Sequence, residues 1–178
     1  VMNYESMLLT FGTDKIEPVN TSETPNPVYG LHDYTLGGGK GSSAQAASSF
    51  NDMIEKAFGR PRDAKQFAEW AQWINYDGYR AIFEGRSEHR RGMLLWMSHS
   101  AWPSMVWQTY DYYFDPNAAY FGCKKASEPL HIQWNPLRDD IEVVNYHAFD
   151  RTGLTATASL FNQDGTLQWT RETKLDIK

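Results

Sequence analysis

The sequence predicts a mixed α/β chain in two parts, an α/β segment over residues 1–127 and an antiparallel β segment over residues 128–178. Two observations lead to this division. Before Pro129, apolar residues recur at helical spacing around one short, continuous apolar run, whereas after it they alternate with polar residues. The 178 residues are enough for one ordinary domain, or for one domain and part of another.

Helices account for most of the first part. Residues 1–11 have helical periodicity, and a second helix should run from Ser42 to about Phe58. Asp63 is a good N-cap for a longer helix, and Asp115, which a proline follows, is a good N-cap for the last one. The longer helix carries one apolar stripe, formed by Phe67, Trp70, Ala71, Ile74, Ala81 and Ile82.

One strand is expected in the first part. Residues 92–97 form a short apolar run that suits a strand buried on both faces, and polar and aromatic residues follow it at once. Functional sites form at the strand ends of buried parallel sheets. We therefore expect the functional residues to lie just after this strand. Residues 12–41 have the Thr, Asn, Pro and Gly content of a long loop, and such loops are usually functional.

The second part should be an antiparallel β segment. Strands are expected over residues 131–135, 140–147, 154–161 and 166–177, separated by turn-forming residues. Four strands are fewer than the about seven of a complete immunoglobulin-like sandwich. The sequence therefore predicts only part of such a sandwich.

Composition argues against several classes of partner. The net charge is -5 and Lys and Arg are scattered, so no nucleic-acid partner is expected. No apolar run approaches the length of a membrane span, so no membrane partner is expected either. The single cysteine and the spacing of the histidines do not suit a metal site, and LGGGKGSS lacks the spacing of a phosphate loop. No cofactor is expected.

Aromatic and polar side chains crowd residues 92–129. Flat indole rings stack on the C–H faces of pyranose sugars, while His, Gln, Tyr and Asp side chains form hydrogen bonds with sugar hydroxyls. The segment therefore predicts a surface that faces a sugar. The alternative is that these rings fill a core or an interface, and for any one of them the sequence leaves both interpretations open.

The run GMLLWMSHSAWPS, followed by WQTYDYYFDPNAAYFGCKKASEPLHIQWN, resembles glycoside hydrolase family 2, particularly its β-mannosidase and exo-β-glucosaminidase branches. In that family the last barrel strand carries a similar pattern, and a Tyr-Asp element, a helix and an immunoglobulin-like domain follow. The resemblance implies that residues 1–127 are the C-terminal portion of a (β/α)8 TIM barrel. It also implies that residues 128–178 are part of an immunoglobulin-like antiparallel β-sandwich.

The resemblance further implies a retaining exo-β-glycosidase, in which one carboxylic acid protonates the leaving oxygen and another carboxylate attacks the anomeric carbon. The family's Asn-Glu pair has no counterpart here, and the attacking Glu is expected upstream of Val1. Glu5 is the nearest candidate, but its neighbours indicate a helix. No catalytic residue is assigned, so the chain alone is expected to be inactive. A periplasmic or secreted location is implied by the family alone.

The resemblance implies that this chain contributes a substrate-binding wall. Trp96 falls where the family's last strand ends in an aromatic residue beneath the sugar, and Trp102 matches the following Trp-Pro. Between them relatives carry Leu-Asn-Asp or Leu-Asn-Asn, whereas this chain has Ser-His-Ser, so the sugar stays undefined. His99 could bind a hydroxyl or be structural. His32 and Asp33 could reach the same site or could fix their loop.

Two other classes of function remain open. One is a non-catalytic carbohydrate-binding or interaction fragment, and the other is a structural α/β domain whose aromatic residues fill a core. Solvent exposure of Trp96 and Trp102 would argue against the structural domain. The expected partners are a β-glycoside, the remainder of the parent enzyme, and further copies that associate through exposed edges of the strands near Met93–Met97 and Leu167–Ile177.

Overall fold

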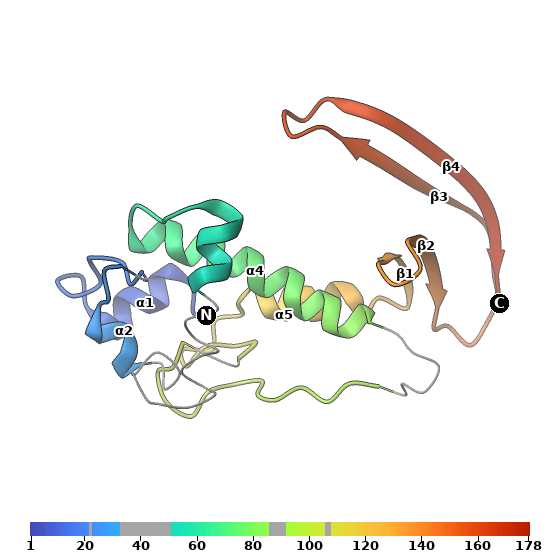
Figure 1. Cartoon of the computed structure of the whole chain (residues 1–178). Coiled ribbons are helices and arrows are strands. Elements are labelled where there is room, and N and C mark those ends of the chain that lie inside the picture. The colour runs from blue at the N-terminus through green and yellow to red at the C-terminus, as the bar shows by residue number, and fades with distance from the viewer. Residues whose placement is uncertain (22, 33–50, 86–91, 106–107) are drawn as a thin grey trace. The chain divides into compact units, whose positions relative to one another are not determined.

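The computed structural model describes residues 1–21, 23–32, 51–85, 92–105 and 108–178 (Figure 1). The chain divides into two compact units, Val1–Lys125 and Ala126–Lys178. In chain order the elements are α1 (Tyr4–Phe11), α2 (Pro27–Leu31), α4 (Ala64–Glu84), α5 (Ala118–Ala126), β1 (Leu130–Asn135), β2 (Asp140–Asn145), β3 (Arg151–Phe161) and β4 (Leu167–Ile177). The mixed α/β content is as predicted, whereas membership of a TIM barrel and of a sandwich stays a prediction.

The core of the first unit lies between α1 and the N-terminal half of α4. Helix α1 matches the helix predicted for the opening residues. Helix α4 begins as predicted, because the Asp63 carboxylate accepts a hydrogen bond from the backbone N–H of Gln66 at 2.8 Å. The buried apolar residues are Met2, Met7, Phe11, Ile16, Val19, Tyr29, Ile54, Ala64, Phe67, Ala68, Ala71 and Met105.

The predicted apolar stripe of α4 is correct for its first four residues, because Trp70 and Ile74 also pack against the core, but wrong for its last two. Phe67 and Ala71 are buried, but Ala81 is exposed and Ile82 is 44% exposed. The reason is that the core of the first unit covers only the first turns of this 21-residue helix. Residues 51–58 are also helical, in agreement with the end of the second predicted helix. The start of that helix, the sequence LGGGKGSS and Asp33 lie outside the described residues.

The predicted start of α5 was wrong. The helix begins at Ala118, and the Asn117 side chain accepts a hydrogen bond from the N–H of Ala119 at 3.0 Å. The N–H of Ala118 is bound at 2.8 Å by the side-chain oxygen of Gln72, from α4. Asp115 instead accepts a hydrogen bond from Asn3 at 2.6 Å. Asp115, the N-cap that local rules predict, therefore bonds to Asn3, which is distant in the sequence.

Helices α4 and α5 approach each other closely at Gly122. A Cβ atom at this position would lie 2.4 Å from the carbonyl oxygen of Tyr76 and 3.1 Å from the backbone nitrogen of Arg80. Both atoms belong to the backbone of α4 and cannot swing aside. Glycine is therefore required where the two helices cross.

The strand predicted for residues 92–97 is absent. The segment is not paired with any described strand, and Leu94 is 96% exposed. The prediction assumed neighbouring strands on both sides, because a continuous apolar run is typical of a strand within a parallel sheet. The described residues supply no such neighbour. Their one parallel pairing is an isolated bridge between His99 and Tyr110.

The second unit consists of two antiparallel hairpins, as the period-two pattern predicts. β1 pairs with β2, and β3 pairs with β4 to form a long curved ribbon (Figure 1). In β1 the buried His131 and Gln133 alternate with Ile132 and Trp134, which are exposed. Each hairpin thus has one polar and one apolar face.

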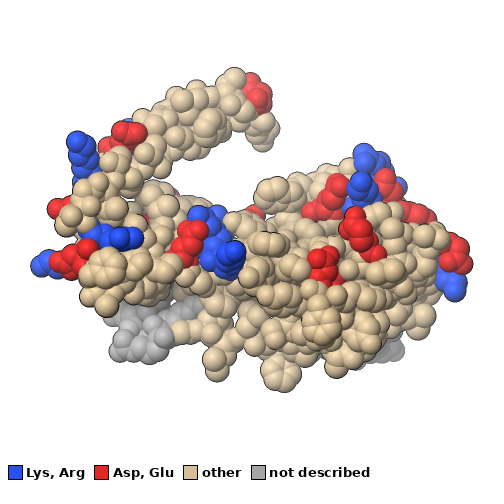
Figure 2. All heavy atoms as spheres, turned by 180° about the vertical axis from the view of Figure 1, so that it is seen from behind, with Lys and Arg blue, Asp and Glu red and all other residues tan. Residues whose placement is uncertain are grey.

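Charged side chains of both signs occur on the surface of the described residues. On the face seen in Figure 2, Lys and Arg lie interspersed with Asp and Glu. On this face the two signs of charge therefore alternate. Within the described ranges, no helix combines the length and the apolarity that a membrane crossing requires.

Candidate functional site

The candidate site is built on the irregular segment from Trp96 to Asn117, whose described residues run side by side in three passes. The carbonyl oxygen of Ser98 accepts the N–H groups of Thr109 at 3.0 Å and Tyr110 at 2.9 Å. The carbonyl oxygen of Thr109 in turn accepts the N–H of Asn117 at 3.0 Å. These bonds join the start, the middle and the end of the segment, which we call the woven loop.

Buried polar side chains hold the woven loop in place. The Asn117 amide donates to the carbonyl oxygen of Gln108 at 2.9 Å, and the Gln108 amide donates to that of Ser104 at 2.7 Å. Asp111 accepts the N–H groups of Tyr113 at 2.9 Å and Asp115 at 3.0 Å through one carboxylate oxygen. All three side chains are at most 1% exposed. Buried backbone N–H and C=O groups need hydrogen-bond partners, and this segment has no regular secondary structure to supply them. The three side chains supply partners instead.

Trp96 lies at the start of this loop and is 75% exposed. Its peptide bond to Met97 is cis. Within this chain, no described residue therefore covers most of the indole. The indole therefore stands in a position where another molecule could stack on it.

Trp102 is partly covered by His32. The two rings stack with centroids 6.2 Å apart and planes at 26°, and Trp102 stays 43% exposed. The His32 ring lies 2.9 Å from the carbonyl oxygen of Pro103, and the His32 carbonyl accepts the N–H of Met105 at 2.9 Å. His32, which directly follows α2, thereby connects the end of that helix to the turn that carries Trp102. The structure thus brings these two predicted site residues together, with His32 in a loop-fixing position.

His99 has a different aromatic partner, Phe114, which the sequence patterns did not single out. Their rings stack with centroids 4.4 Å apart and planes at 15°. Phe114 has a φ of 64°, in the left-handed region, which costs an L-residue about 1–2 kcal/mol. Its side chain is nevertheless 74% exposed. The only hint in the sequence was the turn-forming Asp-Pro after Phe114.

Several buried polar atoms of the woven loop have no partner among the described residues. They are the hydroxyl of Ser100, one carboxylate oxygen of Asp111, the amide oxygen of Gln108 and Nε2 of His99. Buried polar groups are normally hydrogen-bonded, and each one left without a partner costs about 1–3 kcal/mol. The loop therefore has unused capacity for hydrogen bonds.

No pair of described titratable groups is assigned a catalytic role. Glu5 is exposed in the first turn of α1, away from any strand end. Desolvation raises the pKa of Tyr110, and its hydrogen bond with Tyr120 adds to the rise. No group of three or more His, Cys, Asp or Glu side chains that could hold a metal ion occurs within the described part of the chain.

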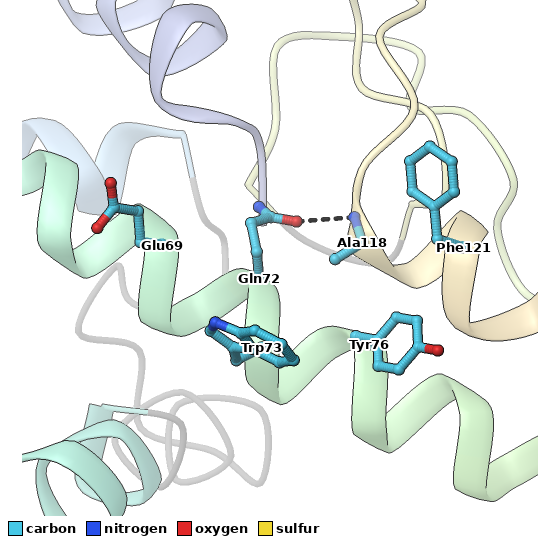
Figure 3. Close-up of a pocket in the computed structure, with 6 residues that line it drawn as sticks. All are labelled: Glu69, Gln72, Trp73, Tyr76, Ala118 and Phe121. Carbon is cyan, nitrogen blue, oxygen red and sulfur yellow. Dashed lines mark hydrogen bonds between the residues drawn. The ribbon is translucent and has the colours of Figure 1, made fainter. Parts of the chain in front are cut away.

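A second feature is an open groove between α4 and α5, with a volume of about 350 Å³ (Figure 3). Trp73 is 61% exposed there and meets Tyr76 edge-on, with ring centroids 6.4 Å apart. The polar Gln72 in its wall is engaged in structural hydrogen bonds with Ala118 and the N-terminal backbone. The groove is lined by Glu69, Gln72, Trp73, Tyr76, Ala118 and Phe121.

Comparison with known proteins gives a consistent result. No family model matches the chain. The exo-β-D-glucosaminidase of Amycolatopsis orientalis is 40% identical over 124 residues, which cover 66% of this chain. The mannosylglycoprotein endo-β-mannosidase of Lilium longiflorum is 32% identical over 148 residues, or 81% of the chain. The chain spans 12% and 15% of the length of these two relatives.

Comparison with solved structures leads to the same group of enzymes. The crystal structure of the Amycolatopsis orientalis exo-chitosanase CsxA matches 71% of this chain with a TM-score of 0.66 and 37% identity, over 16% of its own length. The β-D-mannosidase from Dictyoglomus thermophilum matches 93% of the chain with a TM-score of 0.63, over 21% of its length, and at 18% identity it shows a shared fold. The relatives are glycoside hydrolases, and this chain belongs to glycoside hydrolase family 2, in the branch of the exo-β-D-glucosaminidases and β-mannosidases.

Proposed function

We propose that the protein containing this chain is a retaining exo-β-glycosidase that removes terminal β-linked sugars, and that this chain contributes part of its substrate-binding wall. The activity is supported by the 40% identity with an exo-β-D-glucosaminidase. The limited role of the chain is supported by its share of that relative, which is 12%. A β-glucosaminide or a β-mannoside is the class of substrate that the relatives' names favour.

The observation that carries the proposal is the 75% exposure of Trp96 at the head of the woven loop. Exposing an indole to water is unfavourable, because about 25 cal/mol are lost for each Å² of apolar surface left uncovered. The C–H face of a pyranose ring would cover that surface. In the proposed enzyme, Trp96 therefore forms the floor on which the terminal sugar lies.

The other site residues have supporting roles in this proposal. Trp102, braced by His32, forms a second aromatic wall, and the exposed part of its ring is the part that is free to touch a sugar. The Nε2 atom of His99 is buried without a partner among the described residues, and in this proposal it is a candidate for hydrogen bonding with a sugar hydroxyl at the edge of the ring. Asp33 follows His32 directly in the sequence and is proposed to contribute a carboxylate beside the same wall.

Catalysis itself is assigned to carboxylates outside this chain. In the proposed domain arrangement, residues 1–127 are the C-terminal portion of a TIM barrel and residues 128–178 are part of an immunoglobulin-like domain. The exposed helical position of Glu5 does not suit a nucleophile at a barrel strand end. A retaining mechanism needs two carboxyl groups about 5–5.5 Å apart.

The test is Trp96→Ala in the full-length protein, with Trp96→Phe as the variant that keeps an aromatic face. We expect Trp96→Ala to lower kcat/KM roughly ten- to a thousand-fold, which corresponds to about 1.4–4 kcal/mol of transition-state binding. Trp96→Phe should lose much less. The melting temperature should change little, because the ring is exposed.

Two outcomes would overturn this proposal. A Trp96→Ala protein that is badly destabilised but kinetically normal would make Trp96 a packing residue. Turnover of a nitrophenyl β-glycoside by the 178-residue chain alone, abolished by Glu5→Gln, would place a catalytic carboxylate in this chain. Sugar binding without hydrolysis by the full-length protein would instead favour a non-catalytic carbohydrate-binding role.

A further inference from the structure

We propose that Phe114 is a carbohydrate-stacking residue, held in place by Asp111 and backed by His99. The inference rests on the proposed function, because it extends the same sugar-binding surface beyond the two tryptophans. Phe114 is outside the set of residues that the sequence pattern predicts for the site. Three features of the structure lead to it.

The first feature is the backbone. Phe114 adopts a φ of 64°, which is unusual for a bulky aromatic residue and common for glycine and asparagine. Strained residues of this kind persist only where the surroundings determine them, and they gather at ligand-binding sites. A turn without this strain was available to the sequence through a glycine at the same position. The turn therefore holds an aromatic ring at a position where glycine would fit without strain.

The second feature is the support beneath the strain. The carboxylate of Asp111 accepts the N–H groups of Tyr113 and Asp115, and the carbonyl oxygen of Asp111 accepts the N–H of Phe114 at 3.0 Å. The Asp111 N–H donates to the carbonyl oxygen of Asp115 at 3.0 Å. Four hydrogen bonds thus close the turn over residues 111–115 around one fully buried aspartate. The position of the ring is fixed by the turn and does not depend on packing in a core.

The third feature is the ring itself. One face of Phe114 lies against the imidazole of His99, at 4.4 Å and nearly parallel. Phe114 is still 74% exposed, so no described residue of this chain covers the opposite face of the ring. A planar, rigid apolar surface is what the C–H face of a pyranose ring needs. His99 in turn comes three residues after Trp96, in the first of the three passes of the woven loop.

This arrangement gives His99 a definite role. Its ring supports the underside of Phe114, whereas direct contact of the imidazole with a sugar hydroxyl would be limited to the ring edge. The ligand is therefore a sugar unit that stacks on Phe114. It also makes His99 a positioning residue for that ring.

The experiment measures the binding of a short oligosaccharide of β-linked glucosamine to the full-length protein by calorimetry. The variants are Phe114→Asn, which suits the left-handed backbone but removes the ring, and Phe114→Tyr, which keeps it. We expect Phe114→Asn to weaken binding about 5- to 20-fold, since one aromatic stacking contact is lost. Phe114→Tyr should bind within about twofold of the wild type.

Stability separates stacking from a structural role. Phe114→Asn should melt at the same temperature as the wild type or higher, because backbone strain is relieved. The matched control is Phe149→Ala, since Phe149 is 57% exposed and stacks on His147 at 4.9 Å in the second unit, but has no left-handed backbone. That variant should leave oligosaccharide binding unchanged.

The outcomes distinguish this inference from the proposed function. If the wild type binds the oligosaccharide, Trp96→Ala weakens binding and Phe114→Asn does not, the role of Phe114 is overturned and the proposed function stands. If Phe114→Asn weakens binding only as far as it lowers the melting temperature, the ring is structural and the inference is overturned. If the wild type binds neither glucosamine nor mannose oligosaccharides, both fail together.

Discussion

The woven loop of the first unit and the β3–β4 hairpin of the second are both rich in exposed aromatic or apolar side chains, but their backbones are held in opposite ways. In the hairpin, backbone hydrogen bonds form a ladder of 11-residue strands, and the side chains decorate it. In the woven loop, buried side chains such as Asp111 and Asn117 bind the backbone directly. The loop therefore depends on a few residues, whereas the hairpin depends on none in particular.

This difference bears on function. A ladder repeats every two residues and presents similar side chains along its length. A loop held by specific side chains can present single rings in unique orientations, such as Trp96 and Phe114. Binding residues are commonly found on loops that a rigid scaffold positions, and here the scaffold is α4, α5 and the core around α1.

The largest effect on stability is expected from Asp111→Ala. Two backbone N–H groups would lose their acceptor, so unfolding should become easier by about 2–4 kcal/mol in denaturant titrations followed by tryptophan fluorescence. Asp111→Asn keeps one acceptor oxygen and should lose less. The hairpin control is Ser159→Ala, which removes an exposed hydroxyl contact with Thr170 and should change stability by less than about 0.5 kcal/mol. Equal effects at the two sites would mean that the loop and the hairpin depend on single side chains to the same degree.

A smaller effect is expected where α4 and α5 meet. Gly122→Ala places a methyl group against the α4 backbone and should destabilise the first unit by about 1–3 kcal/mol. Gly78→Ala is the matched control, because a Cβ atom there meets nothing within 4 Å and the helix should gain about 0.5–1 kcal/mol. Opposite signs in thermal unfolding are the expected result. A neutral Gly122→Ala would show that the two helices separate easily.

The smallest effect concerns association of the second unit. Leu160 and Trp169 pair across β3 and β4 on the apolar face, and each is 43% exposed. We expect the chain to self-associate at low micromolar concentration through this hairpin, whose outer edges are unpaired among the described strands. Leu160→Lys should weaken association about tenfold in sedimentation experiments, or about 1.4 kcal/mol. Thr157→Lys, on the polar face, should not. A wild-type chain that sediments as a monomer would contradict the expectation.

Sequence patterns predicted the elements whose stability is local. The Asp63 cap of α4 and the four strands of the second unit appear as predicted, because an N-cap bond spans three residues and a hairpin is defined by its own alternation. The resemblance to family 2 also followed from a contiguous run of residues. For these features no information from distant parts of the chain was needed.

Other features depended on contacts between residues far apart in the sequence. The run at residues 92–97 is apolar enough for a buried strand, but a strand needs partners, and none pairs with it among the described residues. Helix α5 begins at Ala118 because Gln72 of α4 binds the N–H there, and Asp115 pairs with Asn3 instead of capping it. The residues around α5 in the sequence do not indicate that Gln72 and Asn3 are its partners.

The candidate site divides in the same way. The sequence alone placed Trp96, His99 and Trp102 in one short segment, in which the two tryptophans carry the family pattern and His99 departs from it. Only the tertiary structure decided that His32 braces Trp102, that Phe114 covers His99, and that Trp96 stays exposed. The physical reason is that ring stacking and exposure depend on which chain segments meet, and in the woven loop buried side chains make that choice.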